Sequence, residues 1–534
     1  MKKTNRYMPL LMALCVVVGI LIGNFYANHF SGNRLNIINS GSNRLSNLLH
    51  IIDDQYVDKV NIDSLVNNAI PLILAELDPH SVYISAKDAQ AANDDFKGSF
   101  TGIGVEFTIR QDTIHVQNVI SNGPAERAGV LAGDKIISVD GKPFVGKIVT
   151  NEEAMHRLKG PKDTKVKIGV LRYGSKKPKY FTITRGEIPQ KSIAATYMLD
   201  DKTGYIRIKN FGETTYPELL IALEQLSQQG FSNLVIDLRD NTGGLLTSAI
   251  QIANEFLPKN KLIVYTEGRK SPKQEFASDG HGSYQKLPLV VLINEVSASA
   301  SEIFAGAMQD NDRATIIGRR SFGKGLVQRP IEFKDGSMIR LTIAHYFTPS
   351  GRCIQKPYVK GDKDAYAMDI EKRFKHGELY SADSIHFADS LKCYTLRRHR
   401  VVYGGGGIMP DFFVPLDTTQ YTPFHRQLSA KSYIINASLR YIDTHRKELR
   451  KKYASFDKFK DSYEVPQNVI DTLLADAAKD KVKPKDDDEL KRTLPQLRLQ
   501  LKALVARDLW DMSQYFCIIN ENNHIVQKAL QLIQ

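Results

Sequence analysis

Three serines in the middle of the chain have the setting that a hydrolytic nucleophile needs. Ser297, Ser299 and Ser301 follow a short apolar run, Leu289–Ile293, and precede apolar residues at helical spacing. A serine at a strand-to-helix junction lies beside unpaired backbone N–H groups and the positive end of the helix, where an oxyanion is stabilised. The same residues also fit a simple N-cap cluster with Glu302 in a capping box. This segment alone does not separate the two interpretations.

A nucleophilic serine needs a base, and a lysine lies further along the chain. Lys324 is flanked by Gly323 and Gly325, so backbone can pack closely around it. If the following residues are extended, Lys324, Leu326 and Gln328 point to one face, because side chains alternate along a strand. Gln328 could then hold the lysine amine. A lysine base must be neutral, which requires burial to lower its pKa from about 10.4.

The same lysine segment also resembles a phosphate-binding loop. The run from Gly318 to Gly325 nearly matches G-x-x-x-x-G-K-[ST] and follows an apolar, strand-like run. The mismatch is Gly325, which stands where a serine or threonine must ligate magnesium. A proline, Pro330, also follows where a helix is required. Both required contexts fail, so a nucleotide hydrolase is a distant alternative.

The two segments together resemble the carboxyl-terminal processing peptidases, the tail-specific serine proteases of family S41. The similar runs are 294–310 and 318–328, supported by 77–84, 235–246, 340–352 and 407–411, and the resemblance covers about residues 45–414. In that family the nucleophile lies three residues before the glutamate of the serine-rich motif and twenty-five before the lysine. Both rules select Ser299.

The resemblance implies a Ser299–Lys324 dyad without a catalytic histidine, with Gln328 orienting the lysine. It implies oxyanion N–H groups from the Gly243–Gly244 region and from Ala300, and no metal or organic cofactor. It also implies an α/β protease core of the ClpP/crotonase type. The alternation of strand-like and helical runs from Thr203 to Val327 independently favours an α/β core.

Three other polar residues are interpreted as structural. His345 lies in an expected core strand, and His80 follows a proline in a turn, where it is a positioning residue rather than a base. Asp237 precedes the glycine turn and is expected to anchor it through hydrogen bonds.

A compact β-rich module is predicted over residues 96–186, because short β-branched runs alternate there with Gly and Asp turns. The module resembles a PDZ domain. Backbone N–H groups of the loop before the first long strand would capture a terminal carboxylate, while the peptide adds to a sheet edge. The loop residues are Gly102, Ile103, Gly104 and Val105. A purely structural PDZ spacer is the competing interpretation.

The N-terminus predicts a membrane anchor. Three basic residues precede an uncharged apolar stretch over residues 7–27, long enough to span a bilayer as a helix. The expected organisation is a cytoplasmic stub (1–6), the anchor (7–27), a linker (28–43), a helical region (44–95), the PDZ module, a protease core (187–420) with an insertion (359–401), and a C-terminal helical region (421–534). A cleaved signal peptide competes with the anchor.

Composition narrows the remaining classes. The net charge is +13, but Lys and Arg are spread over many segments without a nucleic-acid signature, so no nucleic-acid partner is expected. Four cysteines make no disulfide framework and no CxxC pair, although a Cys353–Cys393 bridge stays open. The resemblance and the N-terminal segment together imply an envelope serine endopeptidase on the periplasmic side of the inner membrane. It is expected to cut exported proteins near their C-termini, with apolar C-terminal tails recognised by the PDZ module. An adaptor and a homo-oligomer stay open as partners. The alternative is a catalytically silent PDZ scaffold on a protease fold.

Overall fold

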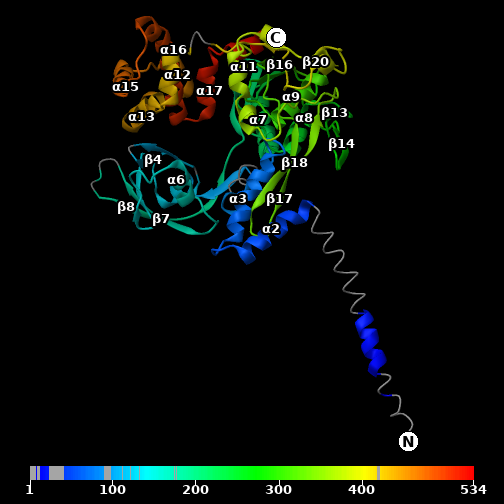
Figure 1. Cartoon of the computed structure of the whole chain (residues 1–534). Helices are drawn as coiled ribbons and strands as arrows, with labels where there is room; N and C mark the ends of the chain where they lie inside the picture. The colour runs from blue at the N-terminus through cyan, green and yellow to red at the C-terminus, as the bar shows by residue number, and fades with distance from the viewer. Residues whose placement is uncertain are drawn as a thin grey trace. The chain divides into compact units, whose positions relative to one another are not determined.

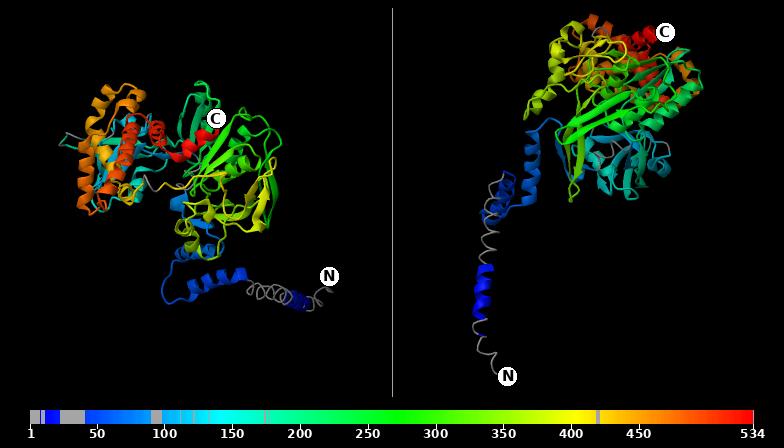
Figure 2. Two further views of the ribbon diagram at one scale, coloured as in Figure 1. Left: turned by 90° about the horizontal axis from the view of Figure 1, so that it is seen from above. Right: turned by 90° about the vertical axis from the view of Figure 1, so that its right-hand side faces the viewer.

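The computed structural model describes residues 8, 12–22, 41–89, 98–110, 112–120, 122–131, 133–172, 175, 177–417 and 421–533. The chain divides into two compact units, Met1–Glu76 and Leu77–Gln534. Figures 1 and 2 show the elements along the chain.

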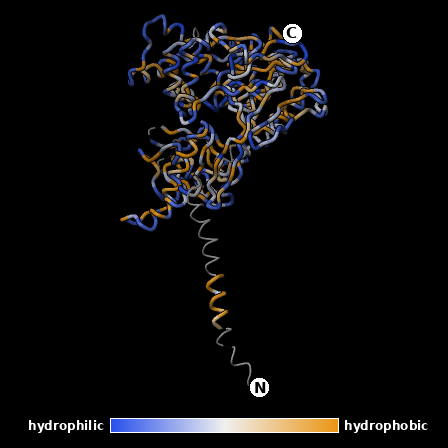
Figure 3. Tube along the Cα trace, turned by 45° about the vertical axis from the view of Figure 1, so that its right-hand side comes forward, coloured by the Kyte–Doolittle hydropathy of each residue, from blue (hydrophilic) through white to orange (hydrophobic). Residues whose placement is uncertain are grey.

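The first unit is helical. Residues 12–22 form a helix whose side chains are apolar and exposed, orange in Figure 3, and helices α2 (Gly41–Gln55) and α3 (Ile62–Ala75) follow. Asn61 caps α3, because its Oδ1 accepts a hydrogen bond from Ser64 N at 3.0 Å. Much of the anchor predicted over 7–27 and of the linker over 28–43 lies outside the described residues. Among the residues that are described, no helix has both the length and the apolar character needed to cross a membrane.

The helical region predicted over 44–95 is interrupted by a strand, although residues 86–89 after that strand are again helical. Residues Val82–Ile84 form strand β1, which pairs antiparallel with β18 (Met338–Phe347) of the second unit. The apolar residues Val82 and Ile84 alternate with Tyr83, which suits a strand better than a helix. This segment therefore belongs to the core and brings the Asp78–Ser81 turn with it.

The PDZ module is a six-stranded antiparallel sheet in the order β3-β4-β5-β7-β8, with β6 beside β5. Strand β2 (Ser99–Gly102) pairs with β9 (Gly186–Pro189) where the chain enters and leaves the module. Two helices, α5 (Pro124–Ala128) and α6 (Asn151–Leu158), complete it. The strands are β3 (Val105–Arg110), β4 (Thr113–Val119), β5 (Lys135–Val139), β6 (Lys142–Pro143), β7 (Lys165–Leu171) and β8 (Lys179–Thr184).

The main core is a six-stranded sheet in the order β10-β11-β12-β15-β16-β21, in which every pair except β10–β11 is parallel. Parallel strands are joined by crossover helices and are covered on both faces. All five residues of β15 are buried, which explains its continuous apolar run. The strands are β10 (Ile193–Met198), β11 (Thr203–Ile208), β12 (Asn233–Asp237), β15 (Leu289–Ile293), β16 (Thr315–Gly318) and β21 (Phe412–Phe413).

The two faces of this sheet have different covers. Helices α7 (Thr215–Ser227), α8 (Leu246–Phe256) and α9 (Ala300–Asp310) pack on the face that carries Ile206 and Ile236. Helix α18 (His524–Ile533) packs on the face that carries Tyr205 and Val235, so the end of the described chain lies against the sheet. Alternate residues of each strand therefore point into two separate apolar cores, one on each face of the sheet.

A second sheet has the order β1-β18-β13-β14, with β17 also beside β18. Its strands interleave in sequence with those of the α/β core, and β17 begins two residues after Lys324. Its other strands are β13 (Leu262–Gly268), β14 (Ser271–Ala277) and β17 (Leu326–Glu332). The predicted insertion over 359–401 contains α10 (Lys363–Ala367), α11 (Asp369–Lys375), two short 3-10 turns (Ala382–Ser384 and Asp389–Leu391) and β19 (Lys392–Tyr394), which pairs with β20 (Val401–Tyr403).

The C-terminal region is helical, as predicted, and has its own apolar core. Its helices are α12 (Pro423–Ala430), α13 (Tyr433–Lys452), α14 (Phe456–Ser462), α15 (Gln467–Lys479), α16 (Asp487–Leu509) and α17 (Met512–Asn520). Helix α17 belongs to this core through Ile518 and also contacts β10, whereas α18 packs against the central sheet. The last two helices therefore connect the helical region to the central sheet.

The cover supplied by α18 predicts an effect on stability at the end of the described chain. Ile525 is 6% exposed in the core beneath the sheet. We expect Ile525→Ala to lower the free energy of unfolding by roughly 2–5 kcal/mol, because the substitution leaves a cavity. Leu220→Ala, on the exposed side of α7 at 40% exposure, is the control and should change it by less than about 0.5 kcal/mol. Denaturant unfolding measures both, and equal effects would contradict this role of α18.

Candidate active site

Ser299 is the N-cap residue of α9, directly after the loop that follows β15. Its backbone has φ 54° and ψ −114°, a conformation that residues other than glycine rarely adopt. Such a sharp strand-to-helix turn exposes the side chain at the edge of the sheet. The predicted strand–serine–helix junction is thus present.

The two neighbouring serines are buried and have structural hydrogen bonds. Ser297 Oγ donates to the carbonyl of Leu238 at 2.8 Å, and Ser301 Oγ donates to the carbonyl of Asn241 at 2.9 Å. Both residues are fully buried, whereas Ser299 is partly exposed. Of the three serines, Ser299 is therefore the one that a substrate can reach.

Glu302 joins the serine segment to the lysine segment. Its Oε2 accepts from Ser299 N at 2.8 Å and from Lys324 N at 2.9 Å, while Oε1 accepts from Gly323 N at 2.7 Å and from Ser321 Oγ at 2.5 Å. The capping box proposed as a purely structural alternative is therefore present, but its carboxylate also holds the lysine loop. Burial raises the pKa of Glu302 to about 7, and the four donors oppose that rise.

Tyr346 of β18 connects the same two segments on the carbonyl side. Its hydroxyl is hydrogen-bonded to the carbonyl of Ser299 at 3.1 Å and to that of Lys324. The ring is fully buried. The backbones of Ser299 and Lys324 are thus tied together by one carboxylate and one phenol.

Lys324 lies between β16 and β17, and its Nζ donates to Gln328 Oε1 at 3.1 Å. This is the contact predicted for an extended segment. Burial lowers the pKa of Lys324, and the positive charge of Arg340 lowers it further, although Glu302 and Asp78 oppose the shift. The flanking glycine Gly325 has no room for a side chain, because a Cβ there would lie 2.8 Å from Gln355 N. The site therefore destabilises the ammonium form of Lys324 relative to a lysine in water.

Gln328 is itself positioned by the turn that precedes β1. Its Nε2 donates to the carbonyl of His80. Asp78 Oδ1 accepts from His80 N at 2.8 Å and from Ser81 N at 3.0 Å, which fixes the turn. The His80 ring contacts Tyr366 OH at 2.9 Å, and burial, followed by the charge of Lys324, lowers the pKa of His80 to about 4. His80 is therefore neutral at neutral pH, in keeping with its predicted positioning role.

The glycine turn after β12 approaches Ser299 closely. Gly243 has φ 103°, and a Cβ at this position would lie 2.7 Å from the Cβ of Ser299. Gly243 N donates to Asn241 Oδ1 at 2.9 Å. Within the described residues, the N–H groups of Gly244 and Ala300 make no hydrogen bond. Of the three predicted oxyanion donors, these two N–H groups are available in this structure.

No hydrogen bond joins the Ser299 hydroxyl to Lys324 Nζ in the described part of the chain. Catalytic hydrogen bonds are often long before substrate binds and shorten in the complex. The structure thus places the two segments side by side, with the lysine amine held by Gln328.

Asp237 is buried at the foot of the glycine turn, where it was expected to act as an anchor. It accepts from Tyr205 OH at 2.5 Å, from Arg207 Nη1 at 2.6 Å and from Arg239 Nη2 at 2.7 Å. Burial alone would raise the pKa of Asp237, but the charges of Arg239 and Arg207 hold it well below the usual range. Arg207 also donates to Asp240 Oδ2 at 2.9 Å, so the cluster fixes the start of the turn.

The other residues considered from the sequence do not contribute side chains to the Ser299–Lys324 site. His345 lies within β18 and contacts the thiol of Cys353 at 3.9 Å. Cys353 and Cys393 are both free thiols in the structure. The loop from Gly318 to Gly325 leads into strand β17 rather than a helix, which excludes the phosphate-loop arrangement. No group of three or more metal-ligating side chains is found among the residues that are described.

The PDZ loop lies in a separate module. Strand β3 is at the edge of its sheet, so one side of the strand is unpaired within the described structure. The carbonyls of Ile103 and Gly104 accept from Ala125 N at 2.8 Å and from Ile120 N at 3.0 Å, which fixes the loop. The N–H groups of the same two residues make no hydrogen bond within the described chain. Gly104 has φ 80°, which favours glycine there.

Sequence reasoning missed three contributors to the site. The capping-box spacing of Glu302 was visible, but its contacts with the lysine loop depend on a tertiary approach. Tyr346 and Tyr366 gave no signal, since single tyrosines in a strand and in an insertion have no diagnostic spacing. Tyr366 shows that the insertion lies against the site.

Comparisons with known proteins agree with this architecture. The description "Peptidase family S41" matches residues 202–365, and "PDZ domain" matches residues 101–183. A family of unknown function matches residues 424–511. The match to the peptidase family thus includes the serine and lysine segments.

Curated relatives are named for the same activity. A carboxy-terminal-processing protease of Bartonella bacilliformis is 40% identical over 317 residues, which is 58% of this chain and 72% of the relative. A carboxy-terminal processing protease of Bacillus subtilis is 35% identical over 344 residues, 63% of this chain and 73% of the relative. A solved photosystem II D1 C-terminal processing protease is 29% identical, with a TM-score of 0.34, over 59% of this chain and 84% of that chain.

The chain therefore belongs to the carboxyl-terminal processing proteases of peptidase family S41. It is a hydrolase with an S41 protease domain, a PDZ domain and a helical C-terminal region.

The contacts of Glu302 predict a strong effect of an almost isosteric substitution. In Glu302→Gln, one acceptor oxygen is replaced by a donor, so N–H groups of Ser299 and Lys324 or of Gly323 lose their partner, at about 1–3 kcal/mol each. We expect labelling by a serine-reactive probe to slow by about tenfold or more. Glu295→Gln, which removes a carboxylate that contacts Arg319, is the control. Wild-type labelling of a folded Glu302→Gln protein would contradict this role.

Proposed function

We propose that this hydrolase cleaves exported proteins near their C-termini through a Ser299–Lys324 dyad, with substrate tails held by the PDZ domain. The observation that supports the dyad most directly is the pair of contacts from one buried carboxylate, Glu302, to Ser299 N and Lys324 N. A catalytically silent scaffold would have no use for a buried lysine that is held by Gln328 and whose pKa is lowered by burial.

The proposed reaction begins with attack of Ser299 Oγ on the scissile carbonyl carbon. Lys324 Nζ accepts the hydroxyl proton, so the lysine becomes an ammonium group, and the carbonyl oxygen becomes an oxyanion. The N–H groups of Ala300 and Gly244 donate to the oxyanion, aided by the positive end of α9. Gly243 provides the close approach between the turn and the serine.

Collapse of the tetrahedral intermediate breaks the C–N bond. Lys324 returns its proton to the leaving amine, which departs with the C-terminal fragment, and an acyl-enzyme on Ser299 remains. Water then attacks the ester carbonyl while neutral Lys324 accepts a proton, and the same proton returns to Ser299 Oγ when the ester bond breaks. Throughout, Gln328 Oε1 holds the amine and the His80 carbonyl holds Gln328.

Tail recognition is assigned to the loop from Gly102 to Val105. The free N–H groups of Ile103 and Gly104 can bind a terminal carboxylate, and the unpaired edge of β3 can accept the peptide as an added strand. An apolar tail is proposed from the resemblance of this module to PDZ domains.

Membrane attachment by residues 7–27, on the periplasmic side of the inner membrane, is the corresponding proposal for location. It is supported by Lys2, Lys3 and Arg6 before the apolar stretch and by the helix over residues 12–22. Fractionation of the full chain and of a variant lacking residues 1–27 tests it, since only the full chain should sediment with membranes.

The first of three predictions on the reaction and on tail recognition concerns the nucleophile. Ser299→Ala should abolish cleavage of a tailed substrate without unfolding the protein, because it removes one partly exposed hydroxyl. Ser297→Ala and Ser301→Ala should keep substantial activity and lose about 0.5–1.5 kcal/mol of stability, since each removes a structural hydrogen bond. Cleavage by Ser299→Ala at the wild-type rate would refute the assignment.

The second concerns the base. Lysine accepts a proton only when neutral, and its pKa is lowered by burial and by Arg340, so acylation should rise with pH through an apparent pKa below about 10.4. Lys324→Arg should be nearly inactive, because a guanidinium stays protonated in this range. Single-turnover acylation across pH measures both. Substantial activity of Lys324→Arg would point to another base, with His345 the first to examine.

The third concerns the tail. A peptide with a free C-terminal carboxylate should be cleaved faster than the same peptide amidated at its C-terminus, because the amide removes the charge that the loop N–H groups bind. An apolar tail should likewise be cleaved faster than a charged one. Equal kcat/KM values for the free acid and the amide would exclude carboxylate capture by this loop.

A further inference from the structure

The insertion over residues 359–401 contacts the loop that carries Lys324. Arg373 of α11 is 3% exposed, and its guanidinium donates to the carbonyl of Arg320 at 2.7 Å and to that of Ser321 at 3.0 Å. Backbone carbonyls in a buried loop need partners, and here the insertion supplies two of them. The insertion is therefore part of the structure that fixes the lysine loop.

Tyr366 of α10 belongs to the same insertion, and its ring is enclosed beside the loop at 7% exposure. The Phe322 ring meets it edge-on, with centroids 5.8 Å apart, and Lys356 Nζ lies 4.0 Å from the centroid of each ring. Lys356 Nζ also donates to the carbonyl of Tyr366 at 3.2 Å and to Asp369 Oδ2 at 3.0 Å. Ring–ring and cation–ring contacts are directional, so together they fix the ring and the direction of its hydroxyl.

The hydroxyl of Tyr366 has two partners near Lys324. Its oxygen accepts from Gln355 Nε2 at 3.4 Å, and Gln355 Oε1 in turn accepts from Gly325 N at 2.8 Å. The hydroxyl also lies 2.9 Å from His80 Nε2. Burial raises the pKa of Tyr366, so the phenol keeps its proton and donates a hydrogen bond to Nε2 of the neutral His80 ring. The contact therefore fixes both the place and the tautomer of that ring.

His80 carries this contact to the proposed base. Asp78 Oδ1 accepts from His80 N at 2.8 Å, and the carbonyl of His80 accepts from Gln328 Nε2. Gln328 Oε1 then accepts from Lys324 Nζ at 3.1 Å. His80 is thus held at its backbone N–H by Asp78 and at its ring by Tyr366. Because both ends of the residue are restrained, its carbonyl meets Gln328 at a defined place.

We propose that Tyr366 is a positioning residue for the base Lys324. It acts through His80 and Gln328, and the inference rests on the proposed Ser299–Lys324 dyad. Without the hydroxyl, the His80 ring loses this restraint, and the lysine amine is less precisely placed. Proton transfer slows when a base moves out of hydrogen-bonding geometry. The insertion thus contributes to the reaction from outside the dyad.

The test compares Tyr366→Phe, which removes only the hydroxyl, with the wild type, each as the full chain. The rate at which an excess of a serine-reactive fluorophosphonate modifies Ser299 reports the activated serine. We expect Tyr366→Phe to slow this reaction about three- to tenfold, as for one lost hydrogen bond. His80→Leu keeps the carbonyl but removes the ring nitrogens, so it should have an effect of similar size. The two substitutions together should add little, because they break the same contact.

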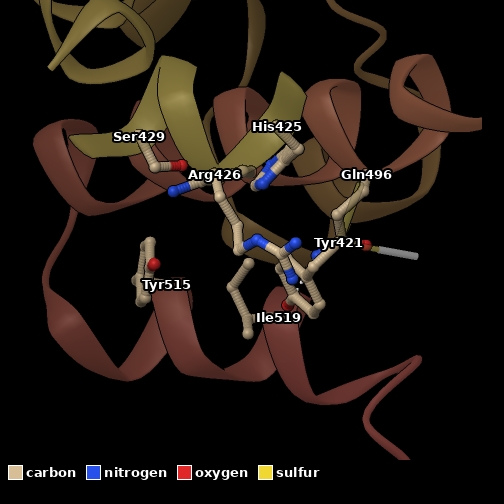
Figure 4. A pocket seen from close by; sticks show the side chains of 8 residues that line it. Tyr421, His425, Arg426, Ser429, Gln496, Tyr515 and Ile519 are labelled. Atoms are coloured by element: carbon tan, nitrogen blue, oxygen red, sulfur yellow. Dashed lines mark hydrogen bonds between the residues drawn. The ribbon is translucent and has the colours of Figure 1, made fainter. Parts of the chain in front are cut away.

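Two tyrosines provide matched controls. Tyr358 meets the Tyr366 ring edge-on, with centroids 6.3 Å apart, and its hydroxyl makes no hydrogen bond within the described residues. Tyr421 forms an edge-to-face pair with His425 in the C-terminal helical region (Figure 4), with centroids 5.2 Å apart, against 5.0 Å for the proposed pair. The Tyr421 hydroxyl accepts from Gln496 Nε2 at 2.8 Å. Tyr358→Phe and Tyr421→Phe should both be labelled at the wild-type rate.

A double substitution separates positioning from a general loss of stability. Gln328→Ala breaks the connection between His80 and Lys324, so Tyr366→Phe should slow labelling no further in that background. A weakened fold would instead slow labelling by the same factor in both backgrounds. Equal factors would therefore overturn the proposal, and so would wild-type labelling of Tyr366→Phe. Denaturant unfolding shows that each variant is folded before it is labelled.

The same measurements distinguish this proposal from the dyad itself. Labelling of Lys324→Arg as fast as the wild type would remove the dyad, and the role of Tyr366 with it. Slow labelling of Lys324→Arg together with wild-type labelling of Tyr366→Phe would leave the dyad in place and refute the role of Tyr366 alone.

Discussion

A single buried carboxylate, that of Glu302, determines the geometry on which the proposed chemistry depends. It accepts from the backbone of Ser299 at the start of one helix and from Gly323 and Lys324 in a loop that comes more than twenty residues later. A side chain that satisfies four donors in a dry interior allows little displacement of any one of them. The nucleophile and the base are therefore placed by their main chains, and only the lysine amine and the serine hydroxyl are left to adjust.

The central sheet and the C-terminal helices hold the glycine turn that approaches Ser299. Asp237 gathers Tyr205, Arg207 and Arg239 at the end of β12, directly before the glycine turn. Asn520 and Asn523 of the C-terminal region contact the same Arg239. The C-terminal helical region, which the sequence presents as a separate tail, thus completes the polar surroundings of the glycine turn.

Much of the site could be predicted because its determinants are local. The apolar run at Leu289–Ile293, the serine cluster after it and the glycine-flanked Lys324 each follow from short-range rules, and the Lys324–Gln328 contact followed from strand alternation. A helical region near the start and the helical C-terminal region were also evident from periodicity, and the β-rich module from its β-branched runs and turns.

What could not be predicted depends on contacts between distant segments. Val82–Ile84 was included in a helical region because a strand of three residues gives little pattern, and its partner Arg340 lies far along the chain. The engagement of Gly243 N by Asn241, the roles of Tyr346 and Tyr366, and the packing of α18 are likewise tertiary. The ClpP/crotonase-type architecture expected for the core stays a prediction.

The position of α18 has a consequence for the order in which the parts of the chain fold. The strands of the central sheet are complete by Phe413, but one of its faces receives its cover from residues 525–533, more than a hundred residues later. Until those residues have packed on the sheet, a folding chain exposes an apolar surface that includes Val235, Val290 and Ile317. Contacts of such long sequence separation form slowly, and exposed sheet faces promote aggregation. The central sheet is therefore covered on both faces only once the helical region has been threaded past it and docked.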